Sequence, residues 1–152
     1  MHITLKTIPH NQQRYETCGD WQIKPDGSFE ILVSDMGNEK YAALVALHEL
    51  CEVLLCQDRG ITDESVTAFD EAYEAQRPEG DESEPGDSPA APYAEEHCAA
   101  TGIERVMASL LNVKWADYEK AINSLPERPV KQGAFGPIRA DGKQAMTNQG
   151  IG

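Results

Sequence analysis

Residues 47–52, Leu-His-Glu-Leu-Cys-Glu, combine an imidazole and two carboxylates at spacings that a helix would bring into one site. At about 100° per residue, His48 and Glu52 lie one helical turn apart on the same face. Leu44 and Leu55 share that face, so we expect it to be buried. Because burying a carboxylate without a partner is costly, the pattern indicates that a cation, a hydrogen-bonding network or a metal ion compensates Glu52.

A later segment, residues 93–111, repeats this pattern. His97 and Glu104 fall on one helical stripe together with Ala100 and Ala108, whose small side chains would let another helix approach closely. If the two stripes pack against each other, two imidazoles and one or two carboxylates converge, a donor set suited to zinc or another divalent metal ion. The predicted metal ligands are His48, Glu52, His97 and Glu104. The last of these is either a fourth ligand or a group that orients an imidazole.

The segment His48-Glu49-x-x-Glu52 resembles the active-site helix of zincin metallopeptidases, especially of minimal gluzincin-like forms, in which a third ligand comes from a later helix. The resemblance implies that His48 is a zinc ligand and that Glu49 is the general base that activates a zinc-bound water. Glu52 stands where the family has its second histidine. The order of the predicted elements extends the resemblance over residues 1–111, and the chain is also similar to small uncharacterised proteins of bacteriophages and prophages.

This resemblance predicts a metal-dependent hydrolase, most simply a peptidase. A metal ion lowers the pKa of a bound water from about 15.7 to about 7, and a neighbouring carboxylate then carries the proton during attack on a carbonyl. Glu49, turned about 100° from His48 toward the rim of the site, is placed for that role. The expected partner is a peptide or protein substrate.

Other interpretations of the same residues remain open. His48 and His97 are also compatible with core histidines whose hydrogen bonds are satisfied, and Glu49 with a solvated helix position. The alternative function is a non-catalytic, metal-stabilised domain that binds another protein through its acidic surface and long loop. Asp70 lies beside the apolar stripe of its helix and either supports the site or pairs elsewhere, while His2 and His10 are expected on the surface.

Two other enzyme classes fit the sequence less well. Glu49-x-x-Glu52 together with Glu84-x-x-Asp87 resembles the magnesium-binding motifs of all-helical nucleoside-triphosphate pyrophosphatases, but Pro85 and Gly86 exclude an interior helical turn there. A ferritin-like di-metal centre requires Glu-x-x-His twice, and position 94 is alanine.

The elements that would position these residues form a small α+β domain. Three short β-prone runs precede residue 35, and a Pro-Asp-Gly turn joins the second to the third, so we expect an antiparallel sheet. Caps and apolar periodicity then predict three to four helices packed on that sheet, in a zincin-like arrangement. The expected helices span residues 39–57, 63–76, 93–111 and 115–124. An acidic, proline-containing loop is expected over residues 77–92, and residues 1–125 form the single domain, followed by an extended or partly mobile tail over 126–152.

Charge and hydropathy narrow the possible partners. The chain has 152 residues, with 13 Lys and Arg against 26 Asp and Glu, a formal net charge of −13. Because phosphate binding needs clustered basic side chains, we expect no nucleic-acid partner. No apolar run is long enough to span a bilayer and no export signal is evident, which predicts a cytoplasmic protein without a membrane partner and with reduced cysteines.

Overall fold

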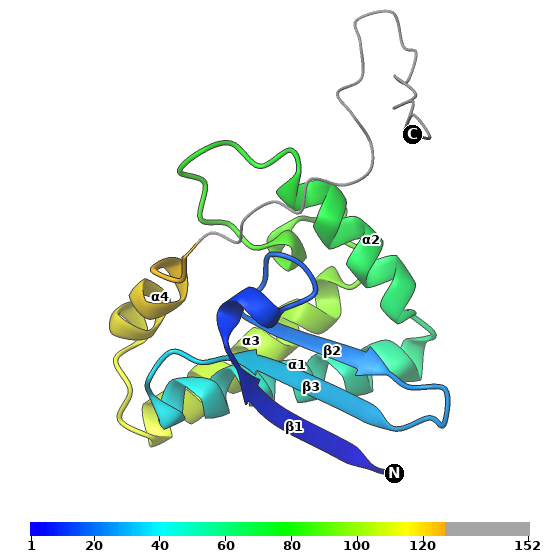
Figure 1. The fold of residues 1–152 in the computed structure, drawn as a ribbon, viewed down its shortest axis with the longest axis horizontal. Coiled ribbons are helices and arrows are strands. Elements are labelled where there is room, and N and C mark those ends of the chain that lie inside the picture. The colour runs from blue at the N-terminus through cyan, green and yellow to red at the C-terminus, as the bar shows by residue number, and fades with distance from the viewer. Residues whose placement is uncertain (127–152) are drawn as a thin grey trace, which may run out of the picture.

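The computed structural model describes residues 1–126, and it has an α+β architecture with the strands preceding the long helices (Figure 1). The strands are β1 (Ile3–Ile8), β2 (Gly19–Ile23) and β3 (Phe29–Ser34). The helices are α1 (Glu39–Arg59), α2 (Asp63–Glu74), α3 (Ala94–Leu110) and α4 (Trp115–Asn123), with short 3-10 turns η1 (His10–Gln12) and η2 (Pro85–Asp87). In this part of the chain no helix is long and apolar enough to cross a membrane. The predicted tail, apart from its first residue, lies outside the described residues.

The three strands form a mixed sheet in the order β1-β3-β2, so the prediction of a purely antiparallel sheet was wrong. β2 and β3 pair antiparallel through the predicted turn, in which Gly27 has a φ of 77°. β1 instead pairs parallel to β3, with Ile3 opposite Phe29. The physical reason is the connection after β1: it carries the chain past the end of β3 to the far edge, so β3 inserts between β1 and β2.

Buried polar side chains hold this crossing connection against the end of β3. The Ser34 hydroxyl lies 2.8 Å from Nδ1 of His10 and accepts a hydrogen bond from the Gln13 amide at 3.1 Å. The same amide donates to the carbonyl oxygens of Leu32 and Cys18. His10, expected on the surface, is therefore buried, because it fixes the start of the loop that leads to β2.

Helix α1 is the centre of the fold and has the expected signals at both ends. The Asn38 side chain accepts hydrogen bonds from the first-turn N–H groups, and Gly60 ends the helix with a φ of 74°. α1 packs against β2, β3 and α3. Its inward face contributes Leu44, Val45 and Val53 to the apolar core, which it shares with the inner face of the sheet.

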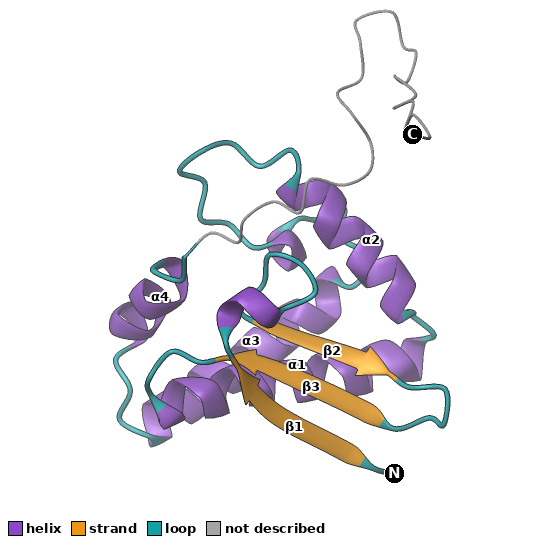
Figure 2. Cartoon of the chain, viewed as in Figure 1, coloured by secondary structure: helices purple, strands orange, loops and turns teal. Residues whose placement is uncertain are grey.

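Helix α3 runs antiparallel to α1 and lies close to it, as the alanine stripe predicts. Ala100 is completely buried and Ala108 nearly so. α2 packs across β2 and η2, and α4 adds Tyr118 to the core. Between α2 and α3 the chain forms the predicted long loop, which Figure 2 shows as an extended excursion, but its η2 turn folds back onto α3.

One arginine ties the crossing connection to both β2 and α2. Arg14 forms two hydrogen bonds with the carboxylate of Asp20, at 2.8 and 2.7 Å, and a third with Asp63 at 2.9 Å. The Asp20 side chain is 1% exposed, whereas that of Asp63 is 19% exposed. Removing the arginine therefore leaves the buried Asp20 carboxylate without a cation beside it, although the Gln22 amide still donates to it at 3.1 Å.

We predict that Arg14→Met lowers the free energy of unfolding by about 2–4 kcal/mol, because a buried charge that loses its partner is strongly destabilising. Asp63→Asn should cost less than about 1 kcal/mol, since its carboxylate stays partly solvated. Urea denaturation of both variants measures the difference. Lys6→Met, which breaks an exposed pair with Glu30, is the control, and equal losses in Arg14→Met and Lys6→Met would contradict the account.

Candidate metal centre

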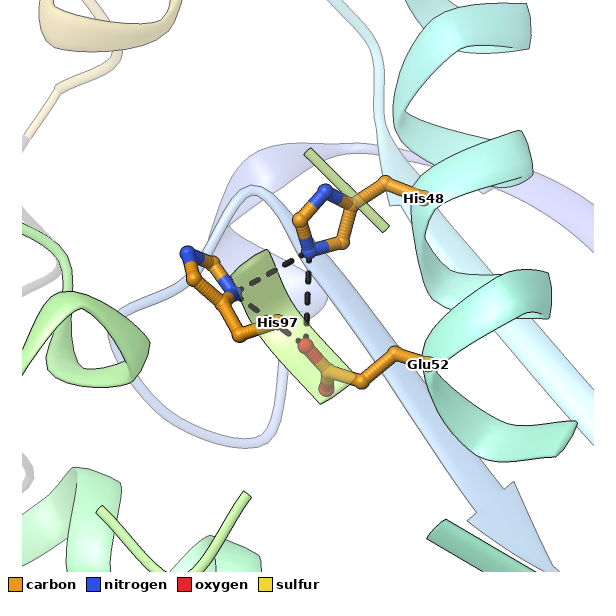
Figure 3. Close-up of side chains that lie close together, drawn as sticks. All are labelled: His48, Glu52 and His97. Carbon is orange, nitrogen blue, oxygen red and sulfur yellow. Dashed lines mark hydrogen bonds and ion pairs between the residues drawn. The ribbon is translucent and has the colours of Figure 1, made fainter. Parts of the chain in front are cut away.

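His48, Glu52 and His97 meet in the interior, between α1 and α3 (Figure 3). Nε2 of His48 lies 3.3 Å from Oε2 of Glu52 and 3.2 Å from Nδ1 of His97, and that nitrogen lies 3.2 Å from the same carboxylate oxygen. All three residues are buried. The i and i+4 spacing on α1 supplies two of the atoms, and the antiparallel packing of α3 supplies the third.

The size of this triangle matches the geometry of a zinc site. Zinc ligands lie about 2.0–2.1 Å from the ion in a tetrahedral arrangement, which places neighbouring ligand atoms about 3.3 Å apart. The three atoms of the triad already stand at that separation, so an ion would need little rearrangement of the side chains. His48, Glu52 and His97 can therefore hold a metal ion.

Each ligand is oriented by a partner on the side away from the triad. Nδ1 of His48 lies 3.0 Å from Oε2 of Glu104, and Nε2 of His97 lies 3.2 Å from Oε2 of Glu84. The indole N–H of Trp21 donates to Oε1 of Glu52 at 2.8 Å, which leaves Oε2 facing the triad. Such outer carboxylate partners are characteristic of metal-bound histidines, because they fix the tautomer and the ring orientation.

These outer bonds determine where the lone pairs point. A carboxylate accepts a hydrogen bond only from an N–H, so Nδ1 of His48 and Nε2 of His97 each carry a proton. In the neutral tautomers the lone pairs on the opposite ring nitrogens then face one another and Oε2 of Glu52. Three lone pairs directed at one point repel each other unless a cation lies among them.

Protons and metal ions compete for that point. Burial lowers the pKa of His48, but its hydrogen bonds to Glu104 and Glu52 outweigh this effect and raise the pKa well above 6.5. Burial likewise opposes the charge on His97, yet Glu52 and Glu84 raise its pKa to about 10. Burial disfavours the Glu52 carboxylate, but the two imidazoles hold its pKa at about 2. Without a metal ion both imidazoles therefore hold protons at neutral pH, and a metal ion that binds there must displace them.

Glu104, the fourth predicted ligand, lies on the far side of the His48 ring from the triad. One of its oxygens faces Nδ1 of His48, and the other accepts a hydrogen bond from the Tyr118 hydroxyl. Of the two roles considered for Glu104, this geometry favours that of a group that orients an imidazole. Tyr118, from α4, extends the chain of hydrogen bonds that runs through Glu104 to Nδ1 of His48, the ring nitrogen on the side away from the triad.

The acidic loop approaches His97 closely through η2. A Cβ atom on Gly86 would lie 2.3 Å from Cγ of His97, so the absence of a side chain there allows the turn to pack on the ring. This contact brings the Glu84 carboxylate to Nε2 of His97, and Oδ1 of Asp87 lies 3.6 Å from the same nitrogen. The loop expected to be solvated surface therefore supplies part of the site.

Glu49, the predicted general base, faces a cavity of about 370 Å³ that also contains the triad. Its carboxylate lies beside Gly19, where an added Cβ would come within 2.3 Å of Oε1. No residue among those described forms a hydrogen bond or an ion pair with it. Burial and the nearby charge of Glu52 raise its pKa well above 4.5. Its catalytic role stays a prediction.

Several residues near the site carried no clear signal in the sequence. Trp21 and Tyr118 come from distant elements, and Glu84 lies in a loop that looks merely acidic. Asp70 does not touch the triad: it accepts hydrogen bonds from the hydroxyls of Tyr15 and Tyr93.

We predict that zinc raises the melting temperature of the protein, because an ion bound only to the folded state stabilises it by about 2.7 kcal/mol at 100 times its dissociation constant. His48→Ala and His97→Ala should abolish this shift and the bound metal. Thermal unfolding with and without zinc, together with elemental analysis, measures both. His2→Ala, which changes an exposed histidine, is the control and should behave as the wild type. If zinc raised the melting temperature of the two triad variants as much as that of the wild type, the assignment of the ligands would be wrong.

A second prediction separates ligands from orienting groups. Glu104→Gln should weaken zinc affinity about 10–100-fold without abolishing binding, as expected for a partner of a bound histidine. Tyr118→Phe should have a smaller effect in the same direction, since it removes only the hydrogen bond to Glu104. Competition with a chromogenic chelator gives the affinities. Complete loss of binding in Glu104→Gln would show that Glu104 is itself a ligand.

In comparisons with protein-family models, curated proteins and solved structures, none matches this chain. The site is therefore defined by its own geometry. What is established is a buried group of two imidazoles and one carboxylate that can hold a metal ion.

Proposed function

We propose that the protein is a metal-dependent hydrolase, most simply a zincin-like metallopeptidase acting on a peptide or protein substrate. The observation that carries the proposal is the triangle of His48 Nε2, Glu52 Oε2 and His97 Nδ1, whose edges of 3.2–3.3 Å suit one zinc ion. The motif over residues 48–52 supports it, because the carboxylate that follows the first ligand is present.

The donor set favours a catalytic over a purely structural zinc site. Structural zinc sites commonly fill all four positions with protein ligands, mostly cysteines, whereas catalytic sites use three and leave one position open. The triad supplies three ligands of the nitrogen and oxygen type, and it faces a cavity of about 370 Å³. A fourth position on that side would be open to water and substrate.

The chain's own residues have separate roles in this proposal. His48, Glu52 and His97 hold the ion, and Glu104 and Glu84 keep the two imidazoles in their metal-binding tautomers. The ion, when bound, makes a water molecule acidic enough to react near neutral pH. Glu49 would take up the proton that a water loses as its oxygen bonds to the peptide carbonyl carbon, and would pass that proton to the amine nitrogen as the C–N bond breaks.

Glu49 is the residue that distinguishes catalysis from binding. A raised pKa favours the protonated form, and a nearby divalent ion counteracts this by stabilising the carboxylate. Its position beside Gly19, with no described partner, leaves the carboxylate available for proton transfer. A glutamate that served only the fold would be expected to have a hydrogen-bond donor.

We predict that Glu49→Gln keeps the bound metal but lowers hydrolysis of a casein or peptide-library substrate about 10²–10⁴-fold, the usual contribution of a general base. Asp58→Asn, an exposed acidic position on the same helix, is the matched control and should retain activity. Metal content and cleavage by mass spectrometry are measured in parallel. If the wild type binds metal but shows no turnover that depends on Glu49, the alternative function, a metal-stabilised protein-binding module, replaces the hydrolase.

A further inference from the structure

The cavity in front of the triad has a strong excess of negative charge. Among the described residues that line it, eleven are Asp or Glu and one, Arg77, is a permanent cation. Arg77 is already engaged, because it lies 2.7 Å from a Glu74 carboxylate oxygen and donates to the Ser83 carbonyl at 2.9 Å. Arg14, which does not itself line the cavity, pairs with the lining carboxylates of Asp20 and Asp63. Within the part of the chain that the structure describes, the carboxylates of the cavity still outnumber the arginines that pair with them.

Helix α2 accounts for one wall of this cavity. Asp63, Asp70 and Glu74 recur at helical spacing and all line it, together with Thr67. Surface helices normally turn an apolar stripe toward the protein, but this stripe of α2 is acidic. The field of several carboxylates in a concave, partly desolvated space is stronger than on an open surface.

The acidic loop adds two further carboxylates to the lining, next to the C-terminal end of α2, where Tyr73 contacts Ser83. Asp81 and Glu82 are exposed and accept hydrogen bonds from neutral groups, Asp81 from Ser83 and Glu82 from the Asn123 amide. Asp81 also lies within the electrostatic influence of Arg77. Deeper in the cavity, Glu49 has no partner among residues 1–126. These carboxylates point to a ligand that brings its own positive charge, since no cation among residues 1–126 forms an ion pair with them.

We propose that the cavity selects peptides that carry a lysine or arginine side chain close to the segment presented to the triad. This inference rests on the proposed function, because it names the substrate class of the same site. A space of about 370 Å³ lies within the range of ligand-binding pockets and accommodates one long side chain with the adjoining backbone. The ammonium or guanidinium group would lie near the acidic stripe of α2 and the loop residues Asp81 and Glu82.

Binding rather than cleavage tests this proposal. The probes are short alanine-rich peptides with a neutral fluorophore, identical except for lysine, glutamine or glutamate at one central position. Fluorescence anisotropy with the wild-type protein, kept metal-free by a chelator so that no peptide is cleaved and every carboxylate of the cavity is retained, should show the lysine peptide binding at least about tenfold more tightly than the glutamine peptide. The preference should shrink as the salt concentration rises from about 0.05 to 0.5 M. Equal or tighter binding of the glutamine or glutamate peptide would overturn the proposal.

Variants separate the cavity from the general charge of the chain. The double variant Asp81→Asn, Glu82→Gln should reduce the lysine preference several-fold. The matched control Asp58→Asn, Glu64→Gln removes the same charge from exposed positions that do not line the cavity, and it should leave the preference unchanged. If both double variants reduced the preference for the lysine peptide equally, the peptide would be attracted by the overall negative charge of the protein and not by the cavity, and the proposal would be wrong.

The two proposals fail in different ways. If the lysine peptide binds selectively to the cavity but the wild-type protein cleaves no peptide, the hydrolase proposal fails while the cationic selectivity stands. If peptides are cleaved with no preference for lysine or arginine near the cut, the selectivity fails and the hydrolase stands.

Discussion

Three electron pairs that converge in a buried space form the constraint on which the site depends. His48, Glu52 and His97 direct their metal-facing atoms at one point, and outer partners prevent the rings from turning away. A cation relieves the repulsion among these atoms, while removal of any outer partner loosens the geometry. The rest of the fold brings these groups together at one end of the cavity that they line.

The residues that surround and orient the triad come from the sheet, from the helices and from the loop before α3. The alanine stripe of α3 lets that helix approach α1, so that His97 reaches the two ligands one turn apart on α1. β2 contributes Trp21, α4 contributes Tyr118 and the η2 turn contributes Glu84. β2 occupies its place beside the site because the crossing connection after β1 is fixed to the end of β3.

Signals within short stretches of the sequence predicted much of this arrangement. Contacts between elements far apart in the sequence were not predicted. Helix caps, helix-breaking residues and apolar periodicity placed the helices to within about two residues. The inward stripes included the three residues that meet in the triad. Strand pairing was harder, because alternation shows which residues form a strand but not which neighbour it joins. The roles of Trp21, Tyr118 and Glu84 depend on contacts between elements far apart in sequence, and His10 looked unpartnered because its partner, Ser34, lies on another strand.

X-ray absorption spectroscopy at the zinc edge of the reconstituted protein tests the central claim most directly. The account predicts a four-coordinate shell of nitrogen and oxygen atoms at about 2.0–2.1 Å, with the outer-shell signature of two imidazoles. His97→Ala should reduce that signature to one imidazole. A shell containing sulfur at about 2.3 Å, from a cysteine such as Cys51, or a protein that takes up no zinc would contradict the account.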